Sequence, residues 1–318
     1  MPSEFEIIRR YFTHPARHTR LGVGDDAALI KPARGFELAV STDMLVSGRH
    51  FFPDDDAYLL GYKALAVNLS DMAAMGAVPR WTTLALALPK VDLKWIKRFV
   101  KGFLDLAGKH KVDWIGGDTT RGPLNICVQI LGEVPQGKAL RRDAAKPGDD
   151  IWVSGFLGDA ALALAHRQKR LRLEPEELRV CLPALHALRP RVNLGKKLRG
   201  LAHAAIDISD GLLADLGHIL ERSGVGAAIE FNRLPKSGVM EKHAEQKAAR
   251  QALLAGGDDY ELCFTVPARR RKDVLRLSRQ LRLRLSRIGK ITRSRGLLLL
   301  DENGKRMKIA VKGYDHFG

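Results

Sequence analysis

The order of apolar and polar residues along the chain predicts alternating helices and strands. Apolar residues at helical spacing predict helices over residues 4–12, 57–76, 93–110, 160–167, 175–188, 192–199 and 212–222. Shorter apolar runs predict strands over residues 27–30, 37–41, 81–88, 113–117, 124–131, 151–154, 204–208 and 261–266. Both halves alternate strands and helices without repeating one motif, which predicts an α/β (or α+β) chain of two lobes.

A stretch rich in turn residues separates the two halves. Residues 133–150 contain Pro135, Gly137, Pro147 and Gly148, and the apolar pattern stops there. We therefore expect an N-terminal lobe of residues 1–137 and a C-terminal lobe of residues 138–318, each of ordinary domain size.

Acidic residues stand beside Gly, Ser or Thr at the ends or edges of apolar runs, in what we interpret as turns. The five sequences are Gly24-Asp25-Asp26, Ser41-Thr42-Asp43, Asn68-Leu69-Ser70-Asp71, Gly116-Gly117-Asp118 and Ile206-Asp207-Ile208-Ser209-Asp210-Gly211. Mg²⁺ binds through one or two carboxylates together with water and substrate phosphates. Several carboxylates on different loops therefore indicate a site for Mg²⁺ ions around a nucleotide, and without metal they would repel one another.

Asp71 lies on a predicted helix of mostly small and apolar residues. Asn68 and Asp71 are three residues apart, so they share a face of that helix. A buried carboxylate there needs a partner or a metal. A carboxylate satisfied locally near the helix end at Gly76 explains the residue equally well.

The common nucleotide-binding and hydrolase motifs are absent from the sequence. It contains no Gly-x-x-x-x-Gly-Lys-Ser/Thr loop, no kinase catalytic loop, no Gly-x-Ser-x-Gly elbow and no His-Glu-x-x-His. The pair Gly22 and Gly24 precedes a predicted strand, so it does not fit a dinucleotide-binding turn. His50, His110 and His203 are candidate bases by residue type, and a structural role is the more common one. A phosphotransferase with this sequence would rely on acids and metal.

Composition changes this interpretation little. The chain has 318 residues, a hydrophobic fraction of 45% and a formal net charge of +17. Twelve of its Lys and Arg residues fall between Arg269 and Arg295, where Val274, Leu277 and Leu281 have helical spacing and residues 281–285 alternate like a strand. These basic residues are therefore expected to form solvated faces. A nucleic-acid interface would be expected to interleave aromatic residues, and this segment has none.

The remaining sequence features point to a cytoplasmic protein. Three isolated cysteines without a Cys-x-x-Cys pattern indicate buried thiols in a reducing compartment. The sequence has no apolar run of membrane-spanning length, and its first residues lack the pattern of a secretory signal.

Taken together, the motifs resemble those of the bacterial thiamine-monophosphate kinase family. The resemblance runs in order through nearly the whole chain, and it rests on the five acidic sequences together with Gly24-Asp25-Asp26-Ala27-Ala28, residues 63–71, Thr119-Thr120, Leu212, Tyr260-Glu261-Leu262 and Lys312-Gly313-Tyr314-Asp315-His316. It implies the two-lobed fold of the aminoimidazole-ribonucleotide-synthetase-like ATP-binding superfamily, with N-terminal α/β lobes that pair across a homodimer. It also implies ATP-dependent phosphorylation of thiamine monophosphate to thiamine diphosphate, the last step in making that cofactor.

The resemblance implies roles for individual residues. The implied Mg²⁺ ligands are Asp26, Ser41, Thr42, Asp43, Asp71, Asp118, Asp207 and Asp210, of which Asp43, Asp71, Asp118 and Asp210 would act on the reacting phosphates. The implied nucleotide contacts are Gly117, Asp118, Arg142 and Ser209, and the implied thiamine-substrate contacts are His50, Asp258 and Tyr314. The family usually has Glu where this chain has Asp258, so that carboxylate is one methylene shorter.

The acceptor in such a reaction is a phosphate that is mostly dianionic at neutral pH and needs no general base. We therefore expect direct in-line transfer from ATP without a phosphoenzyme. Sister enzymes of the superfamily remain alternatives. Selenophosphate synthetase would require a reactive cysteine or selenocysteine near the N-terminus, whereas the first cysteine here is Cys127. The hydrogenase-maturation dehydratase would require a C-terminal cysteine, whereas this chain ends in His316-Phe317-Gly318. Aminoimidazole ribonucleotide synthetase is a further alternative.

Overall fold

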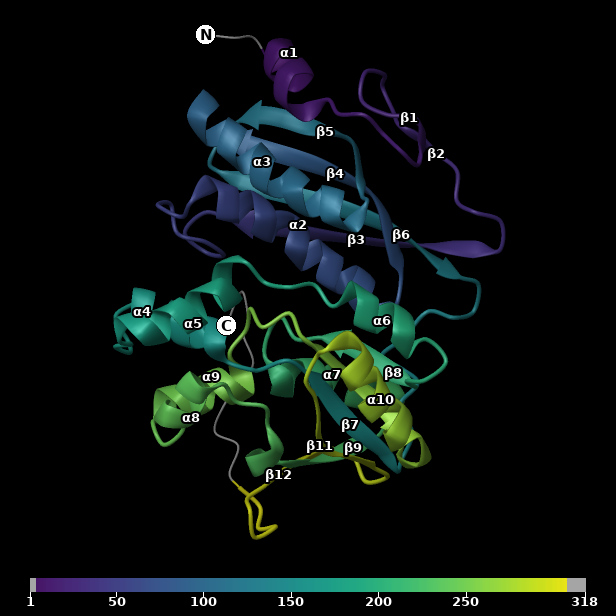
Figure 1. Cartoon of the computed structure of the whole chain (residues 1–318), viewed down its shortest axis with the longest axis vertical. Helices are drawn as coiled ribbons and strands as arrows, with labels where there is room; N and C mark the ends of the chain where they lie inside the picture. Colours follow the sequence, from purple (N-terminus) through teal and green to yellow (C-terminus); the bar gives the residue numbers. More distant parts are fainter. Residues whose placement is uncertain (1–3, 308–318) are drawn as a thin grey trace. The chain divides into compact units, whose positions relative to one another are not determined.

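The computed structural model describes residues 4–307 and contains two compact units. The N-terminal unit comprises Met1–Met72 and Ala77–Gly137, and the C-terminal unit comprises Ala73–Gly76 and Lys138–Gly318. Each unit has its own central sheet with helices packed on it (Figure 1). The predicted α/β class is confirmed.

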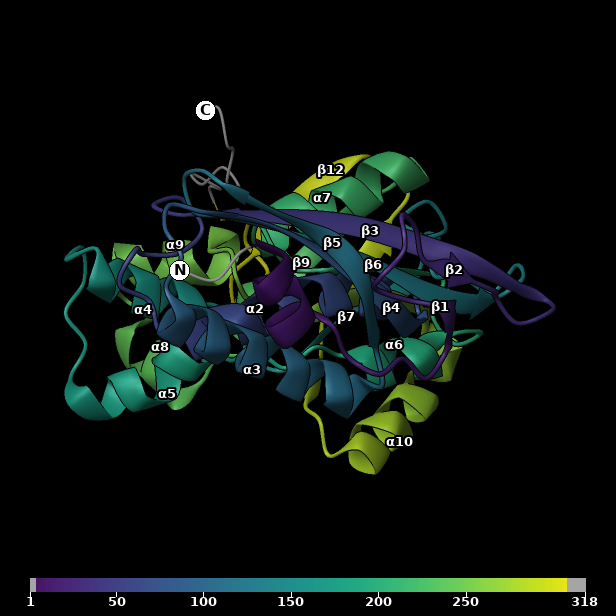
Figure 2. The same cartoon turned by 90° about the horizontal axis from the view of Figure 1, so that it is seen from above.

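The N-terminal unit contains a mixed four-stranded sheet in the order β3-β6-β4-β5. β6 pairs antiparallel with β3 and β4, whereas β4 and β5 are parallel. Both long helices lie on the same side of this sheet (Figure 2). The elements are α1 (Glu4–Ile7), the π-helical turn η1 (Ile8–Phe12), β1 (Thr19–Leu21), β2 (Leu29–Ile30), β3 (Phe36–Val46), α2 (Ala57–Ala74), β4 (Val78–Leu88), α3 (Leu93–His110), β5 (Asp113–Arg121) and β6 (Asn125–Pro135).

Two glycines allow α2 and α3 to cross with their backbones in contact. A Cβ atom on Gly61 would lie 2.0 Å from the carbonyl oxygen of Phe99, and a Cβ on Gly102 would lie 1.9 Å from that of Tyr58. Any larger residue would push the helices apart. The close crossing supports a core in which Phe99 and Trp81 are almost completely buried.

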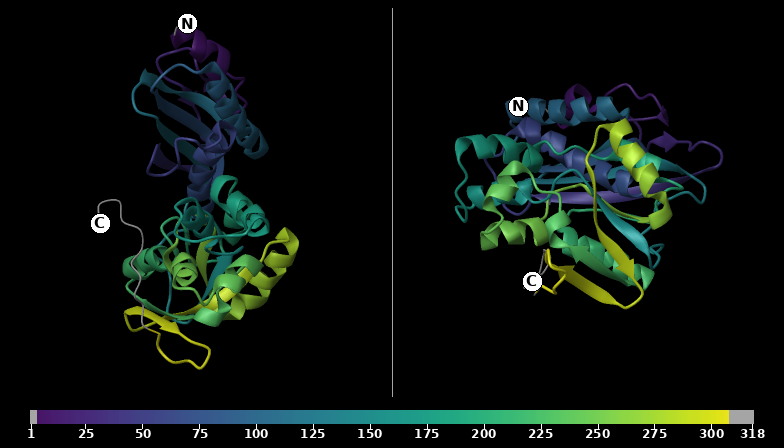
Figure 3. Two further views of the ribbon diagram at one scale, coloured as in Figure 1. Left: turned by 90° about the vertical axis from the view of Figure 1, so that its left-hand side faces the viewer. Right: turned by 60° about the horizontal axis from the view of Figure 1, so that its bottom comes forward.

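The C-terminal unit contains a six-stranded sheet in the order β12-β9-β11-β7-β10-β8. Every residue of β7 and β10 is buried, as expected for central strands covered on both faces. Two views show α7 and α10 on opposite sides of the sheet (Figures 2 and 3). The elements are β7 (Asp149–Ser154), α4 (Asp159–Arg167), α5 (Pro175–His186), α6 (Val192–Leu198), β8 (Ala204–Asp207), α7 (Leu212–Ser223), β9 (Gly226–Glu230), η2 (Phe231–Arg233), α8 (Gly238–His243), α9 (Lys247–Ala255), β10 (Leu262–Pro267), η3 (Ala268–Arg270), α10 (Arg271–Leu281), β11 (Leu285–Thr292) and β12 (Gly296–Leu300).

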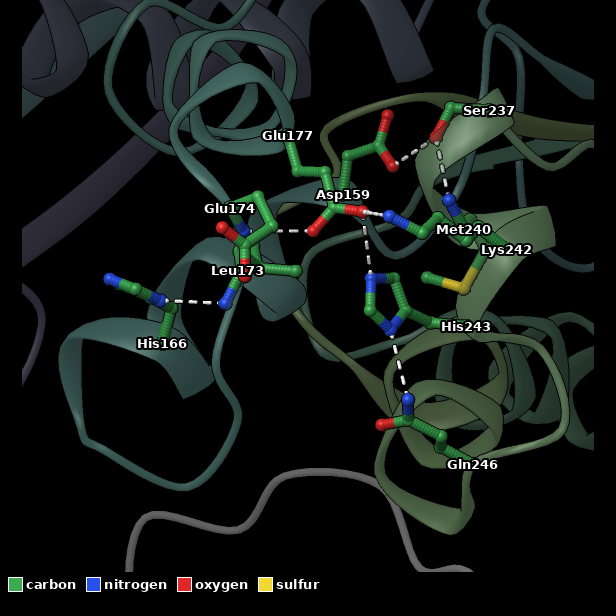
Figure 4. A network of polar contacts seen from close by, with 10 residues as sticks. All are labelled: Asp159, His166, Leu173, Glu174, Glu177, Ser237, Met240, Lys242, His243 and Gln246. Atoms are coloured by element: carbon green, nitrogen blue, oxygen red, sulfur yellow. Dashed lines mark hydrogen bonds and ion pairs between the residues drawn. The ribbon is translucent and has the colours of Figure 1, made fainter.

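A network of polar contacts ties α5 to α8 in the C-terminal unit (Figure 4). The buried carboxylate of Glu177 accepts a hydrogen bond from the backbone N–H of Glu174 at 2.9 Å and one from Lys242 Nζ at 2.6 Å. His243 Nε2 lies 3.2 Å from the same carboxylate. The hydrogen bonds from Lys242 and the Glu174 N–H lower the pKa of Glu177 from an ordinary 4.5 to about 2.

This pKa shift predicts a pH-dependent contribution of Glu177 to stability. A lowered pKa means that ionised Glu177 stabilises the fold at pH values above about 4.5, and that the contribution disappears as the pH falls towards 2. We expect Glu177→Gln to lower the free energy of unfolding by about 2 to 3 kcal/mol at pH 7 and by less at pH 3. The measurement is urea unfolding at both pH values. Glu176→Gln is the matched control, because its side chain is 75% exposed, and equal losses for the two variants would contradict the prediction.

The basic segment is part of the C-terminal unit. In α10, Val274 and Leu277 are buried and Lys272, Arg276 and Arg279 are exposed, which confirms the predicted solvated helix face. The predicted start of the next strand, at residue 281, is wrong. Residue 282 ends α10 in a left-handed conformation, and β11 begins at residue 285.

Two other expectations concern cysteines and membranes. All three cysteines are free, and Cys181 and Cys263 are buried whereas Cys127 is half-buried. None of the helices within residues 4–307 is long and apolar enough to cross a bilayer.

Candidate functional site

Three predicted metal ligands meet where β3 faces α2 in the N-terminal unit. Ser41 Oγ donates a hydrogen bond to Asp71 Oδ2 at 2.5 Å, across 30 residues of sequence. Ser41 and Asp43 are two residues apart on β3, so their side chains lie on the same face of the strand as the buried Leu45. The structure therefore brings Ser41, Asp43 and Asp71 to one side of the sheet.

Thr42 lies between them with its side chain on the opposite face of β3. Gln129 Nε2, on the neighbouring strand β6, donates to Thr42 Oγ1 at 3.4 Å. The alternation of a strand sends adjacent side chains to opposite faces. The hydroxyl of Thr42 therefore does not join the Ser41 hydroxyl and the Asp71 carboxylate.

Gly117 and Asp118 occupy the interior of β5. A Cβ on Gly117 would lie 1.8 Å from the carbonyl oxygen of Leu84 on β4, and the φ angle of Gly117 is 151°. Only glycine allows this approach of the two strands. Asp118 follows with an exposed side chain, and three strand spacings, about 14 Å, separate β5 from the strand that carries Asp43. The structure does not bring Asp118 and Asp43 together within one chain.

Three of the five predicted acidic turns are thus not turns. Residues 68–71 lie within α2. Residues 41–43 lie in the middle of β3 and residues 116–118 lie in the middle of β5, which extends to Arg121 rather than ending at 117. Cross-strand pairing stabilises these segments as strands, although Gly, Ser, Thr and Asp locally favour turns.

Two further predicted residues of this unit lie in loops. His50 follows β3, and its Nδ1 accepts the backbone N–H of Val46 at 3.0 Å, which leaves the ring proton on Nε2. Asp26 is exposed, and its backbone N–H donates to the carboxylate of Asp25 at 3.1 Å.

In the C-terminal unit, the predicted residues Asp207, Ser209 and Asp210 lie between β8 and α7. Asp207 ends β8 and is 4% exposed, whereas Ser209 and Asp210 are half-buried in the turn that follows. Gly211 then precedes α7 with a φ of 107°, and a Cβ there would lie 2.6 Å from the backbone of Ala255.

A second loop, residues 256–261, lies against this turn. The N–H of Asp258 donates to the carbonyl oxygen of Ser209 at 2.9 Å, and the N–H of Tyr260 donates to that of Ile208 at 2.7 Å. Asp258 and Tyr260 have φ angles of 68° and 47°, which are unusual for residues with a Cβ. The structure therefore brings Asp258 next to Ser209 and Asp210, and it holds the backbone of this loop in an uncommon conformation.

Three carboxylates to which the sequence analysis gave no role in the site support these two loops. Asp215 Oδ2 accepts the N–H groups of Ser209 and Asp210, each at 3.0 Å. The carboxylate of Asp259 accepts the N–H of Gly158 at 2.8 Å, and Glu261 forms hydrogen bonds with Ser154 and Arg191. The sequence offered two signals for these residues: the acidic run at 258–261, and Asp215 in the first turn of a predicted helix.

Burial controls the protonation of these carboxylates. Removal from water, together with the nearby charges of Asp207 and Asp210, raises the pKa of Asp215 to about 7. Burial also raises the pKa of Asp259 well above its ordinary value. Carboxylates whose pKa is raised by burial and nearby charges are characteristic of functional sites.

Arg142 lies elsewhere in the C-terminal unit. Ser223 Oγ donates to the carbonyl oxygen of Arg142 at 2.8 Å, and Ser223 is the last residue of α7. Ser209 precedes the first residue of the same helix, whose 12 residues span about 18 Å. The backbone of Arg142 is therefore at the opposite end of α7 from Ser209. Tyr314, the third predicted substrate contact, lies outside the described residues.

The candidate histidine bases other than His50 fit structural positions. His203 Nδ1 lies 2.8 Å from the buried carboxylate of Asp149, and His110 is the last residue of α3.

The donors of the two units fit Mg²⁺ in chemical type, because they are carboxylate and hydroxyl oxygens. Within residues 4–307, no group of three or more His, Cys, Asp or Glu side chains is arranged to hold a metal by itself. Mg²⁺ does not need such a group, because it commonly binds through one or two carboxylates and completes its shell with water and phosphate. Asp71, held by Ser41, and Asp43 on the same face of the sheet provide two carboxylates.

Comparisons with known proteins agree with this arrangement. Residues 24–134 match the family model of the AIR synthase related protein N-terminal domain, and residues 146–300 match that of the C-terminal domain. The chain is 47% identical to the thiamine-monophosphate kinase of Salmonella typhimurium, over 99% of this chain and 98% of the relative.

Solved structures show the same relationship. The crystal structure of thiamine-monophosphate kinase from Stenotrophomonas maltophilia superposes with a TM-score of 0.87 at 46% identity, covering 96% of this chain and 98% of the other. AaThiL complexed with AMPPCP and TMP superposes with a TM-score of 0.78 at 30% identity, covering 90% and 89%. The family predicted from the sequence motifs is therefore confirmed: the chain belongs to the thiamine-monophosphate kinase family, within the AIR synthase related proteins.

Proposed function

We propose that this protein is an ATP-dependent kinase that phosphorylates thiamine monophosphate to thiamine diphosphate. The observation that carries the proposal is its family membership over the full chain, including likeness to AaThiL, which was complexed with AMPPCP and TMP. The position of Ser41, Asp43 and Asp71 on one side of the sheet in one unit, and the contact of Asp258 with Ser209 in the other, support it.

The chain's own residues would orient the reactants. The hydrogen bond from Ser41 holds the Asp71 carboxylate in one orientation, and β3 holds Asp43 on the same side. The hydrogen bond from the N–H of Asp258 to the carbonyl of Ser209 holds the backbone of Asp258, a proposed substrate contact, beside the turn proposed to contact the nucleotide. Because the substrate phosphate is itself the nucleophile, the protein has only to align the two phosphates for in-line transfer.

We propose Mg²⁺ as the cofactor, held by oxygen donors of each unit. The proposed ligands are Asp26, Ser41, Asp43, Asp71 and Asp118 in the N-terminal unit and Asp207 and Asp210 in the C-terminal unit; Thr42 remains a proposed ligand, although its hydroxyl points away from Ser41. When bound, Mg²⁺ would neutralise phosphate charge that otherwise keeps two anionic reactants apart. We further propose that Gly117, Asp118, Arg142 and Ser209 contact the nucleotide, and that His50, Asp258 and Tyr314 contact the thiamine substrate.

Phosphorus NMR of the purified protein with ATP, Mg²⁺ and thiamine monophosphate tests the proposal. We expect ADP and a diphosphate ester to form, and both signals to be abolished by EDTA. Intact ATP would contradict the proposed function. The substrates of the sister enzymes, such as selenide or formylglycinamidine ribonucleotide, would then be tried in the same assay.

We also propose a homodimer that uses the face of the N-terminal sheet opposite its two helices. Leu38, Val40 and Met44 alternate along the edge strand β3 on this face, and they are 40%, 55% and 54% exposed. An apolar row on an edge strand is a site for association. A second chain would also be needed to bring one Asp118 close to an Asp43, since about 14 Å separates them within a chain.

Light scattering coupled to size-exclusion chromatography tests the dimer. We expect the protein to elute with twice the 35.2 kDa mass of one chain, and Val40→Glu to convert it largely to monomer, because a buried unpaired charge opposes association. Val180→Glu is the control, since Val180 is 50% exposed on α5 of the other unit. A monomeric wild-type protein at micromolar concentration would contradict the proposal.

We propose a cytoplasmic location, for which the free thiols Cys127, Cys181 and Cys263 are the support. Nucleic acid is not a proposed partner, because the basic residues of α10 form a solvated helix face and residues 269–295 contain no aromatic residue.

A further inference from the structure

The turn between β8 and α7 carries three residues of the proposed site, and the side chain of Asp215 holds its backbone. Asp215 lies in the first turn of α7 and is only 3% exposed. Its Oδ2 atom accepts two hydrogen bonds, from the N–H groups of Ser209 and Asp210, both at 3.0 Å. One oxygen thus fixes the positions of two consecutive site residues.

The side chain of Asp215 reaches back along the chain, away from the free N–H groups of its own helix. A carboxylate in the first turn of a helix commonly caps the free N–H groups of that helix, whereas the Asp215 oxygen reaches back to residues 209 and 210. The Asp215 side chain therefore orders two residues that precede its own helix.

The loop at 256–261 also holds the backbone of the turn. Ser209 accepts a hydrogen bond from the N–H of Asp258 at 2.9 Å, and Ile208 accepts one from the N–H of Tyr260 at 2.7 Å. Asp215 therefore binds N–H groups of the turn, and the loop binds its carbonyl oxygens. Without the Asp215 oxygen, the two N–H groups would have to find water, and the half-buried turn would lose two hydrogen bonds.

We propose that Asp215 is a positioning residue: its carboxylate oxygen sets the spacing and direction of Ser209 and Asp210 so that they can bind the metal–nucleotide complex. The inference rests on the proposed function, because that function assigns the nucleotide to Ser209 and the metal to Asp210. It makes the hydrogen-bond acceptor of Asp215, rather than its charge, the feature that matters.

The test compares three variants of Asp215. Asp215→Ala removes the acceptor, Asp215→Asn keeps an oxygen at the same distance without the charge, and Asp215→Glu keeps the charge but moves the oxygen by about one methylene. We expect Ala and Glu to weaken binding of Mn²⁺–ADP by about 10-fold or more, measured by equilibrium dialysis without turnover. We expect Asn to stay within about threefold of the wild type.

Asp149→Ala is the matched control. Asp149 is also 3% exposed and also accepts a backbone hydrogen bond, from Lys146 at 3.0 Å. It lies at the far end of the same sheet, because Asp149 pairs with Pro267 whereas Asp207 pairs with Leu262 at the other end of β10. We expect this variant to lose thermal stability as Asp215→Ala does, but to bind Mn²⁺–ADP like the wild type.

Two outcomes would overturn the inference. Wild-type binding by Asp215→Glu would show that the position of the oxygen does not matter. Equal weakening in Asp149→Ala and Asp215→Ala would show a general loss of stability. Failure of the proposed function is distinguishable, because it would appear as absence of thiamine diphosphate in the NMR assay while nucleotide binding still separated the variants.

Discussion

Asp71→Asn is expected to lower turnover at least about 100-fold while leaving the fold intact. Asp71 accepts the hydroxyl hydrogen of Ser41 at 2.5 Å, so one carboxylate oxygen is engaged by protein and the group is held in a single orientation. Asparagine has nearly the same size but carries no charge and only one acceptor oxygen. With its oxygen turned to Ser41 it presents to Mg²⁺ an amide nitrogen that does not coordinate, and with its oxygen turned to Mg²⁺ it supplies no negative charge.

The loss should appear in kcat, measured at saturating ATP, thiamine monophosphate and Mg²⁺. Asp43→Asn is expected to behave in the same way, because Asp43 lies on the same face of β3. Asp105→Asn is the control: this carboxylate lies in the same unit and pairs with Lys101 at 2.6 Å, but its side chain is 43% exposed on α3. Near-normal turnover of Asp71→Asn or Asp43→Asn at saturating Mg²⁺ would show that the proposed metal ligands are wrong.

Gly117→Ala is expected to cost about 3 kcal/mol or more of stability and to abolish activity. The new methyl group would lie 1.8 Å from the carbonyl oxygen of Leu84, well inside van der Waals contact. It would also sit on a residue with a φ of 151°. Relief requires β4 and β5 to separate, which would move the adjacent Asp118.

The neighbouring glycine supplies the control for this prediction. A Cβ on Gly116 would have no other atom within 4 Å, so Gly116→Ala should change the free energy of unfolding by less than about 1 kcal/mol. Chemical denaturation of the two variants makes the comparison. Similar stabilities for the two would mean that the close contact between the strands does not restrict residue 117.

Elements whose local signals agree were predicted well from the sequence. The helix predicted over residues 93–110 is α3, with the same bounds. Its apolar face is periodic, and Asp92 caps its start by accepting the N–H groups of Lys94 and Trp95 at 3.0 and 3.1 Å. Local sequence and tertiary packing favour the same conformation there, so the sequence pattern predicts the helix correctly.

Elements that depend on distant partners were predicted less well. The strand expected over residues 37–41 runs from Phe36 to Val46 because it pairs along its whole length with β6, some 90 residues away. Strands β9 and β12 were not predicted; they form the far edge of the C-terminal sheet by pairing with each other in parallel. Strand pairing of this kind leaves little trace in any short window of sequence.

The sequence by itself determined the two-lobed α/β class, the family and the chemical type of the site. The reason is that the motifs are short local sequences of carboxylate, glycine and hydroxyl residues, which can be identified without a structure. Only the tertiary structure decided which donors meet. Ser41 contacts Asp71, whereas the side chain of Thr42 lies on the other face of the strand. Asp258 contacts Ser209 across 49 residues of sequence. The backbone of Arg142 lies at the opposite end of α7 from Ser209. The physical reason is that strand alternation and long-range hydrogen bonds set the direction of a side chain, and both are properties of the packed chain.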